Sequence, residues 1–180
     1  MGEFNKVSAS FKQYNVENIT GYFIVEDNKM RVYSNAEFNN QKFGIAGEVD
    51  FQNEVKLNLK IKANSFDIAK ALPKDNIKGK ADFDIFVCGA AENPEISGDL
   101  EIKNVLIKEQ QINKIKAEFI YKNDIVTINN GVAIIGLGEV NIKGSYNIVD
   151  GVFKGNAEGK NISVEKIFPQ IHGIANFNVN

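Results

Sequence analysis

Few residues of this 180-residue chain have the types and spacing that catalysis requires. His172 is the only histidine, so a metal site with two histidines is excluded, and its place after Pro169 suggests an ordinary solvated side chain. Cys88 is the only cysteine, which excludes an intramolecular disulfide; it ends an apolar strand and is interpreted as a small core residue. Asp82 and Asp84 share a strand face with neighbouring lysines, which indicates a solvated face rather than a carboxylate pair for acid–base catalysis.

Three short motifs do not indicate a catalytic or binding site either. The Gly136-Leu-Gly138 sequence is not followed by a helix, so it does not predict a phosphate-binding loop. Asn18 and Asn161 each begin a glycosylation sequon, a pattern that often occurs by chance. No group of residues has the spacing of a zinc site. We therefore predict a protein that is not an enzyme and that needs no metal or cofactor.

The charge balance and the hydropathy of the chain argue against further classes of protein. The 21 basic and 23 acidic residues are scattered singly, and the net charge is −2. This balance predicts neither a nucleic-acid partner nor a polybasic patch for a membrane surface. No apolar run approaches the ~18 residues of a membrane-spanning helix, and the first ten residues lack the pattern of a signal peptide. Because the second half of an internal repeat also stops short, we expect a segment of a longer chain.

Hydrophobic alternation dominates the sequence. In residues 55–63, apolar side chains fall on every second position and lysines or Asn58 lie between them, which predicts a strand with one dry face. The same rhythm predicts an all-β fold of about fifteen short strands. The expected strands span residues 7–11, 19–25, 30–32, 43–45, 49–51, 55–63, 77–87, 96–102, 105–107, 115–121, 125–128, 132–137, 140–146 and 153–157, with others near the C-terminus.

Two short helical turns interrupt this pattern. The first is expected over residues 66–72, with Asn64 or Ser65 as its N-cap and Pro73 as its end. Residues 89–94 are expected to form a loop. The second helical turn is expected before Pro169.

The chain contains two copies of one unit. Residues 62–83 are repeated as residues 158–177, and Pro73 corresponds to Pro169 at a shift of 96 positions. The match extends backwards to residues 16–23 and 112–119. We predict a first repeat unit at residues 1–95 and a truncated second unit at residues 96–180, which stack to bury their apolar faces. Unpaired strand edges near residues 7–11 and 171–179 would favour self-association.

The apolar faces of the predicted strands are the one group of residues that suggests a function. Glycine and alanine lie beside large residues on these faces, which favours a strongly curved antiparallel sheet with an open groove. The candidate groove residues are Val55, Leu57, Leu59, Ile61, Ile77, Ala81, Phe83, Ile85, Ile115, Phe119, Tyr121, Val140, Ile142, Phe153 and Phe177. Two alternatives use the same residues: a closed barrel around a small apolar ligand, and a structural β-solenoid of a surface protein with a dry core.

Four stretches resemble the β-groove repeats of the AsmA-like envelope proteins, most closely the translocation and assembly module (TamB) branch. They are residues 94–107 (PEISGDLEIKNVLI), 112–130 (INKIKAEFIYKNDIVTINN), 136–147 (GLGEVNIKGSYN) and 161–179 (NISVEKIFPQIHGIANFNV). Each is a pattern of apolar, glycine and proline positions, and together with the repeat they extend over almost the whole chain.

This resemblance implies a function. It implies a segment of a long protein that is anchored in the inner membrane of a diderm bacterium and crosses the periplasm. Its folded-over sheet would conduct phospholipids along a hydrophobic groove, and it would support outer-membrane protein assembly through a barrel partner. The chain lacks the family's N-terminal anchor and characteristic C-terminal segment. The family has no catalytic residues, so only the groove-facing positions carry over.

Overall fold

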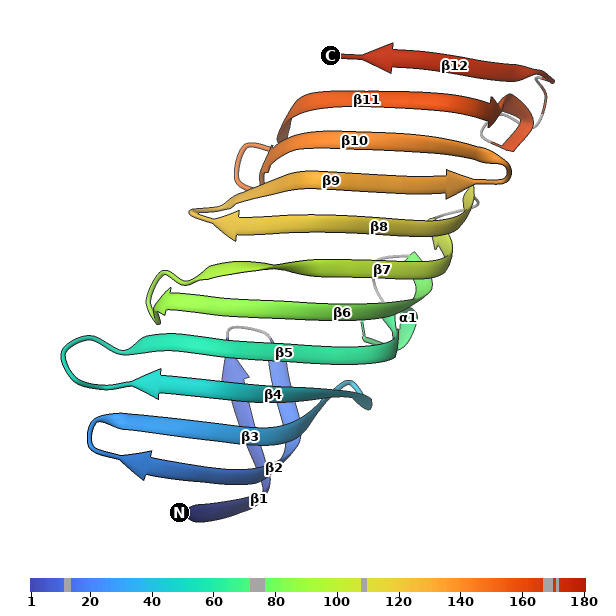
Figure 1. The fold of residues 1–180 in the computed structure, drawn as a ribbon. Coiled ribbons are helices and arrows are strands. Elements are labelled where there is room, and N and C mark those ends of the chain that lie inside the picture. The colour runs from blue at the N-terminus through green and yellow to red at the C-terminus, as the bar shows by residue number, and fades with distance from the viewer. Residues whose placement is uncertain (12–13, 72–76, 108–109, 167–169, 171) are drawn as a thin grey trace.

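The computed structural model describes residues 1–11, 14–71, 77–107, 110–166, 170 and 172–180. These residues form one open antiparallel sheet of twelve strands, whose spatial order is the order of the chain (Figure 1). The strands are β1 (Gly2–Phe11), β2 (Tyr14–Glu26), β3 (Lys29–Phe38), β4 (Gln41–Asp50), β5 (Lys56–Asp67), β6 (Ile77–Ala90), β7 (Glu95–Ile107), β8 (Gln110–Lys122), β9 (Ile125–Ile135), β10 (Gly138–Asn147), β11 (Val152–Ser163) and β12 (Ile174–Val179). The short helix α1 (Ile68–Ala71) follows β5, and the 3-10 turn η1 (Val164–Lys166) follows β11.

The predicted all-β class and open curved sheet are confirmed. The sheet does not close into a barrel, because β1 and β12 form its two ends in the described part of the chain. Each strand pairs with its sequence neighbours, so most connections are hairpin turns that need only a few residues. Asn123 and Asp124, for example, both have positive φ (50° and 60°), as a two-residue hairpin turn requires.

The strands are fewer and longer than the expected fifteen. Residues 43–45 and 49–51 belong largely to one strand, β4, which continues through Gly47. Residues 105–107 continue β7 beyond Asn104, and residues 125–128 and 132–135 both lie in β9. The predicted breaks between these strands were wrong because Gly47 and Asn104 lie within strands, and Asn104 has a left-handed φ of 52° there.

The first helical turn also differs from the expectation. Phe66 and Asp67 still belong to β5, and α1 covers only four residues. Asp67 is the capping residue, since its Oδ1 accepts a hydrogen bond from the Lys70 amide at 3.3 Å. Ser65 has a φ of 54° and donates its own amide hydrogen to Asp82 Oδ1 at 2.7 Å, so it forms a bulge rather than a cap. Leu72 and Pro73 lie outside the described residues.

Left-handed residues inside strands bend the sheet. Lys6, Asn18, Ser65 and Asn161 all have φ between 51° and 56°, and the pairing register shifts beside each of them. Such bulges increase the local twist and turn a strand out of its plane. Beyond Lys6 and Asn18, the outer half of the β1–β2 hairpin passes behind β3 to β5 in the view of Figure 1.

Strand bounds recur at the shift found in the sequence. Strand β2 covers residues 14–26 and β8 covers 110–122; β5 covers 56–67 and β11 covers 152–163. Ser65 and Asn161, the left-handed residues of β5 and β11, are 96 positions apart. The division at residues 95 and 96 falls at the start of β7. The recurrence agrees with the internal repeat, and the division into a first unit at residues 1–95 and a truncated second unit at residues 96–180 stays a prediction.

We therefore expect residues 14–67 to superpose on residues 110–163 in an experimental structure. The physical reason is that the same pattern of apolar positions and bulges dictates the same pairing and the same bend. Different strand pairings in the two segments would contradict the repeat. The predicted equivalence of Pro73 and Pro169 concerns residues outside the described part of the chain.

Candidate functional site

Fourteen of the fifteen candidate groove residues lie within strands. The exception is Val55, which precedes β5 and is 42% exposed; its carbonyl accepts a hydrogen bond from the Ala91 amide at 2.8 Å. The expectation that residue 55 begins the strand was therefore wrong by one position.

Cross-strand register shows that these side chains share one face. Residues directly opposite each other in adjacent antiparallel strands point to the same side of a sheet. Leu57 lies opposite Val49, and Ile61 lies opposite both Ile45 and Ile85. The remaining members follow from the same pairings: Leu59 with Val87, Ala81 with Ile102, Phe83 with Leu100, Ile115 with Ala133, Phe119 with Ile128, Tyr121 with Val126, Val140 with Ala133, Ile142 with Ala157, Phe153 with Tyr146, Phe177 with Gly159 and Ile77 with Ile107. We call this side the apolar face.

The pairings also add members that were not among the candidates. Ile96, Leu100 and Ile102 of β7 lie between candidates of β6 and β8, and Val126 and Ile128 of β9 continue the row. Their period-two spacing was visible in the sequence. Their common side became clear only from the register, because the bulges change which positions of neighbouring strands face each other.

Glycines lie opposite large side chains on this face. Gly47 is opposite Leu59, and Gly98 is opposite both Ile85 and Phe119. A methyl group added to Gly47 would overlap the Asn58 carbonyl oxygen, and its φ of 147° is unfavourable for other residues. The aromatic ring of Phe177 lies against Gly159. Large side chains therefore lie over glycine backbone and form a continuous apolar surface.

Apart from the β1–β2 hairpin, whose outer half turns toward it beside β3 to β5 (Figure 1), the apolar face has no second layer of strands in the described part of the chain. The structure exposes 12012 Å², whereas a compact monomer of this mass would expose about 8,700 Å². Tyr146, Phe153 and Phe177 of this face remain 36–46% exposed. Among the described residues, the buried hydrophobic side chains are few and mostly small: Ala36, Val49, Ala63, Ala71, Ala81, Val105 and Ile162.

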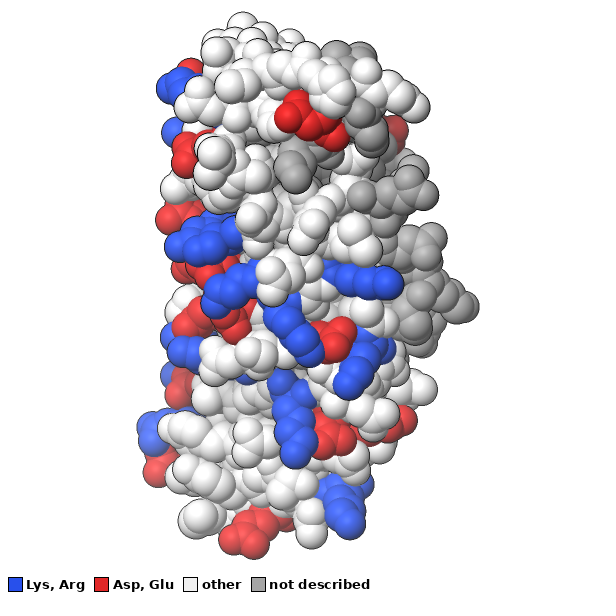
Figure 2. All heavy atoms as spheres, turned by 90° about the vertical axis from the view of Figure 1, so that its right-hand side faces the viewer, with Lys and Arg blue, Asp and Glu red and all other residues white. Residues whose placement is uncertain are grey.

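The opposite face of the sheet is charged, and we call it the polar face. Lys56, Asn58, Lys60 and Lys62 of β5 alternate with the apolar residues, and Asp82 and Asp84 follow on β6. Figure 2 shows charged side chains in a column along its left margin, which is the side that faces the viewer in Figure 1. The sheet therefore turns its β1–β2 hairpin toward the apolar side.

Ion pairs connect the strands of the polar face. Lys60 Nζ lies 2.9 Å from Asp84 Oδ2, and Lys103 Nζ lies 3.0 Å from Asp82 Oδ2. Lys116 Nζ lies 3.0 Å from Glu101 Oε2. Each pair crosses between strands, so it stabilises the register by a modest amount.

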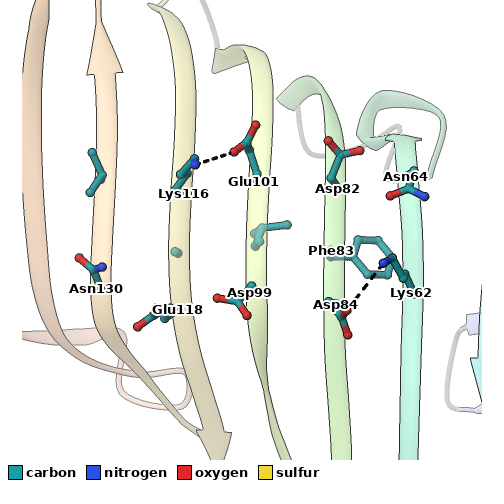
Figure 3. Close-up of a pocket in the computed structure, with 13 residues that line it drawn as sticks. Lys62, Asn64, Asp82, Phe83, Asp84, Asp99, Glu101, Lys116, Glu118 and Asn130 are labelled. Atoms are coloured by element: carbon teal, nitrogen blue, oxygen red, sulfur yellow. Dashed lines mark ion pairs between the residues drawn. The ribbon is translucent and has the colours of Figure 1, made fainter.

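A hollow of about 450 Å³ lies among these charges, over β5 to β9 (Figure 3). Lys116 holds the pKa of Glu101 below its ordinary value, and Lys103 and Lys114 act in the same direction. The pKa of Asp82 is lowered first by the Ser65 amide and then by Lys103. Both carboxylates are therefore ionised at neutral pH, which makes them unsuited to donate protons in catalysis.

We expect Glu101→Gln to destabilise the fold at neutral pH and to have progressively less effect in acid. Because the folded-state pKa of Glu101 is lowered, its contribution is present above the ordinary glutamate pKa and is lost as the pH falls toward the folded-state value. The measurement is urea unfolding from neutral pH to pH ~3, in the range where carboxylates titrate.

Glu118→Gln on β8 is the matched control. Glu118 also lines the hollow, but it has no ion pair among the described residues, so its replacement should change stability less. If the difference in free energy of unfolding between wild type and Glu101→Gln stays constant with pH, the ionised Glu101 carboxylate is not the origin of the stabilisation.

The potentially reactive residues Cys88 and His172 do not lie together in one site. Cys88 lies opposite Asn58 and Glu95, so it belongs to the polar face; the expectation of a core cysteine was wrong. Its strand continues beyond the expected end at residue 87, to Ala90, and this extension places residue 88 in the alternating pattern. His172 is exposed just before β12.

Searches of family models, curated proteins and solved structures found no match to this chain. In the described ranges, no helix has the length and hydrophobicity to span a membrane. Within the same ranges, no three His, Cys, Asp or Glu side chains converge in a way that could bind a metal ion.

Proposed function

We propose that this chain is a segment of an envelope lipid-transfer protein whose apolar face carries phospholipid acyl chains. The observation that carries the proposal is the exposure of a continuous apolar face across the sheet. Exposed apolar area of this extent is costly in water, so it favours a ligand or partner of the same chemistry. The resemblance of the repeats to the AsmA-like proteins favours a lipid.

The dimensions of the sheet suit extended hydrocarbon. Twelve strands at about 4.8 Å spacing make a face roughly 50 Å long. The hydrocarbon core of a bilayer is about 30 Å thick, so one acyl chain spans roughly 15 Å. Several acyl chains could therefore lie along the face in succession, as transfer between membranes requires.

The composition of the face fits a moving ligand. Within the strands it is built mainly from Leu, Ile, Val, Phe, Tyr, Ala and Gly, and the charged residues of β5 and β6 point to the other side. Tyr121 has a polar end on this side, and its hydroxyl donates to Asp124 Oδ1 at 3.1 Å, beside the β8–β9 turn. Acyl chains would meet few hydrogen-bonding groups that could hold them in one position.

In this proposal the chain works in the periplasm as part of a longer protein anchored in the inner membrane. An outer-membrane barrel partner would bind at other segments of that protein. Both statements rest on the resemblance of residues 94–107, 112–130, 136–147 and 161–179 to the family's repeats.

Native mass spectrometry and lipid extraction of gently purified protein test the proposal. We expect phospholipid to copurify with the chain, because the apolar face would otherwise remain in contact with water. Protein that is free of lipid and does not take up phospholipid from vesicles would favour the alternative of a structural β-solenoid segment.

A further inference from the structure

The two rims of the sheet, where the strands end, differ in charge. We call the rim at which β5 leads into α1 the α1 rim, and the opposite rim, with the turns β4–β5, β6–β7 and β8–β9, the hairpin rim (Figure 1). At the α1 rim, residues 67–71, 77–81, 103–107 and 110–114 contain Lys70, Lys78, Lys80, Lys103 and Lys114, and Asp67 is the only acid in these ranges. Figure 2 looks onto this rim and shows basic side chains across its middle.

The hairpin rim has the opposite charge. Residues 52–58, 91–97 and 120–126 contain the acids Glu54, Glu92, Glu95 and Asp124 and the bases Lys56 and Lys122. Both of these lysines pair with acids of the same rim, Lys56 with Glu54 at 3.5 Å and Lys122 with Glu95 at 3.1 Å. The remaining acids leave this rim with a net negative charge.

Part of the positive charge of the α1 rim has no partner in the described part of the chain. Three of its lysines pair with acids: Lys80 with Asp67 at 2.8 Å, Lys103 with Asp82 at 3.0 Å and Lys114 with Glu101 at 3.6 Å. Lys70 and Lys78 are exposed and form no ion pair with any described residue. These two ammonium groups are therefore accessible to an anion from solution.

A phospholipid on the apolar face must keep its charged head group in water. A phosphate placed over apolar side chains would lose its hydration without gaining a complementary charge. Strand β6, with 14 residues at about 3.3 Å each, is roughly 45 Å long, whereas one acyl chain spans roughly 15 Å. A lipid whose head group lies at one rim can therefore place its acyl chains on the face without reaching the other rim.

We propose that the phosphate of a phospholipid on the apolar face lies at the α1 rim, beside Lys70 and Lys78, and that this rim prefers head groups with a net negative charge. The lysines attract the phosphate, and the acids of the hairpin rim repel it. In a zwitterionic head group the amine offsets this attraction, whereas phosphatidylglycerol has no such amine. The inference rests on the proposed function and adds the orientation and the class of the lipid.

Two double variants with the same change in net charge test the rim. K70Q/K78Q removes the unpaired lysines of the α1 rim, and K56Q/K122Q removes two lysines of the hairpin rim. All four side chains are exposed, so both variants should fold. We expect K70Q/K78Q to weaken binding of phosphatidylglycerol at least about fivefold at low ionic strength, the factor that one lysine near an anionic lipid contributes. Binding of phosphatidylcholine should change less, and K56Q/K122Q should weaken neither.

The measurement is an NMR titration of the 180-residue chain with short-chain phosphatidylglycerol and phosphatidylcholine below their micelle concentrations, so that no membrane surface is present. Equal affinity of wild type for the two lipids, or equal weakening in the two variants, would overturn this inference alone. Binding of neither lipid would overturn the proposed function and this inference with it. Inorganic phosphate should compete only weakly; competition as strong as that of phosphatidylglycerol would show a site for free phosphate instead of a lipid head group.

Discussion

Leu59→Arg should leave the fold intact and remove phospholipid binding. Leu59 lies in the middle of β5 on the apolar face, opposite Gly47 and Val87. Because Leu59 is only partly buried, an arginine side chain can extend from this face into water and keep its charge solvated. Acyl chains that lie on the same strand would lose contact with Leu59 and meet a guanidinium group that they would have to desolvate.

The matched control is Asn58→Arg on the same strand. Asn58 belongs to the polar face, opposite Glu48 and Cys88, so the same added charge lies on the other side of the sheet. It should change neither thermal unfolding nor lipid uptake. Phe83→Asp is a less suitable test than Leu59→Arg, because Phe83 also packs edge-to-face against Phe66 with 5.4 Å between ring centroids.

The measurement combines thermal unfolding with uptake of phospholipid from vesicles. Loss of folding in Leu59→Arg would contradict the proposed openness of the face, since it would show that Leu59 is enclosed. Retained folding together with normal lipid uptake would contradict the role of the face in lipid binding.

Val105→Asp should unfold the protein. Val105 is 1% exposed in β7, and its Cα lies close to the backbone of Gly79 in β6. A carboxylate at this position would have neither water nor a complementary charge, which costs several kcal/mol. Domains are stable by only about 5–15 kcal/mol, so most of the folded population should be lost.

Circular dichroism and urea unfolding measure this effect. Gln111→Asp on the adjacent strand β8 is the control, because Gln111 is exposed and should accept a carboxylate with little change. A Val105→Asp variant as stable as wild type would contradict the assignment of Val105 to the small buried core. A charge that is tolerated at residue 59 and not at residue 105 would distinguish the open part of the sheet from its enclosed part.

The alternation of single residues was sufficient to predict much of the fold. Strands β5 and β6 follow from their strict alternation of apolar and charged positions, and the all-β class follows from the repetition of that rhythm. The common side of Leu57, Leu59 and Ile61 was also visible in the sequence. These features depend only on local period-two geometry.

The bends and the polar face could not be predicted in the same way. Residues 96–102 and 105–107 were predicted as two strands, whereas they belong to one strand in which Asn104 is left-handed. Asparagine tolerates this conformation both in turns and in bulges, so its type alone does not distinguish them. The partners of Glu101 depend on the register of β7 with β8, which places Lys116 directly opposite Glu101. Long-range pairing, rather than local propensity, decided these features.

Photocrosslinking on the two faces of β5 tests the lipid-binding account most directly. A photoreactive amino acid at Leu59 would lie on the apolar face, and the same group at Asn58 would lie on the polar face of the same strand. With radiolabelled phospholipid in vesicles, we predict a lipid adduct at residue 59 and little or none at residue 58. No adduct at residue 59, or equal adducts at both positions, would contradict the claim that the apolar face carries phospholipid.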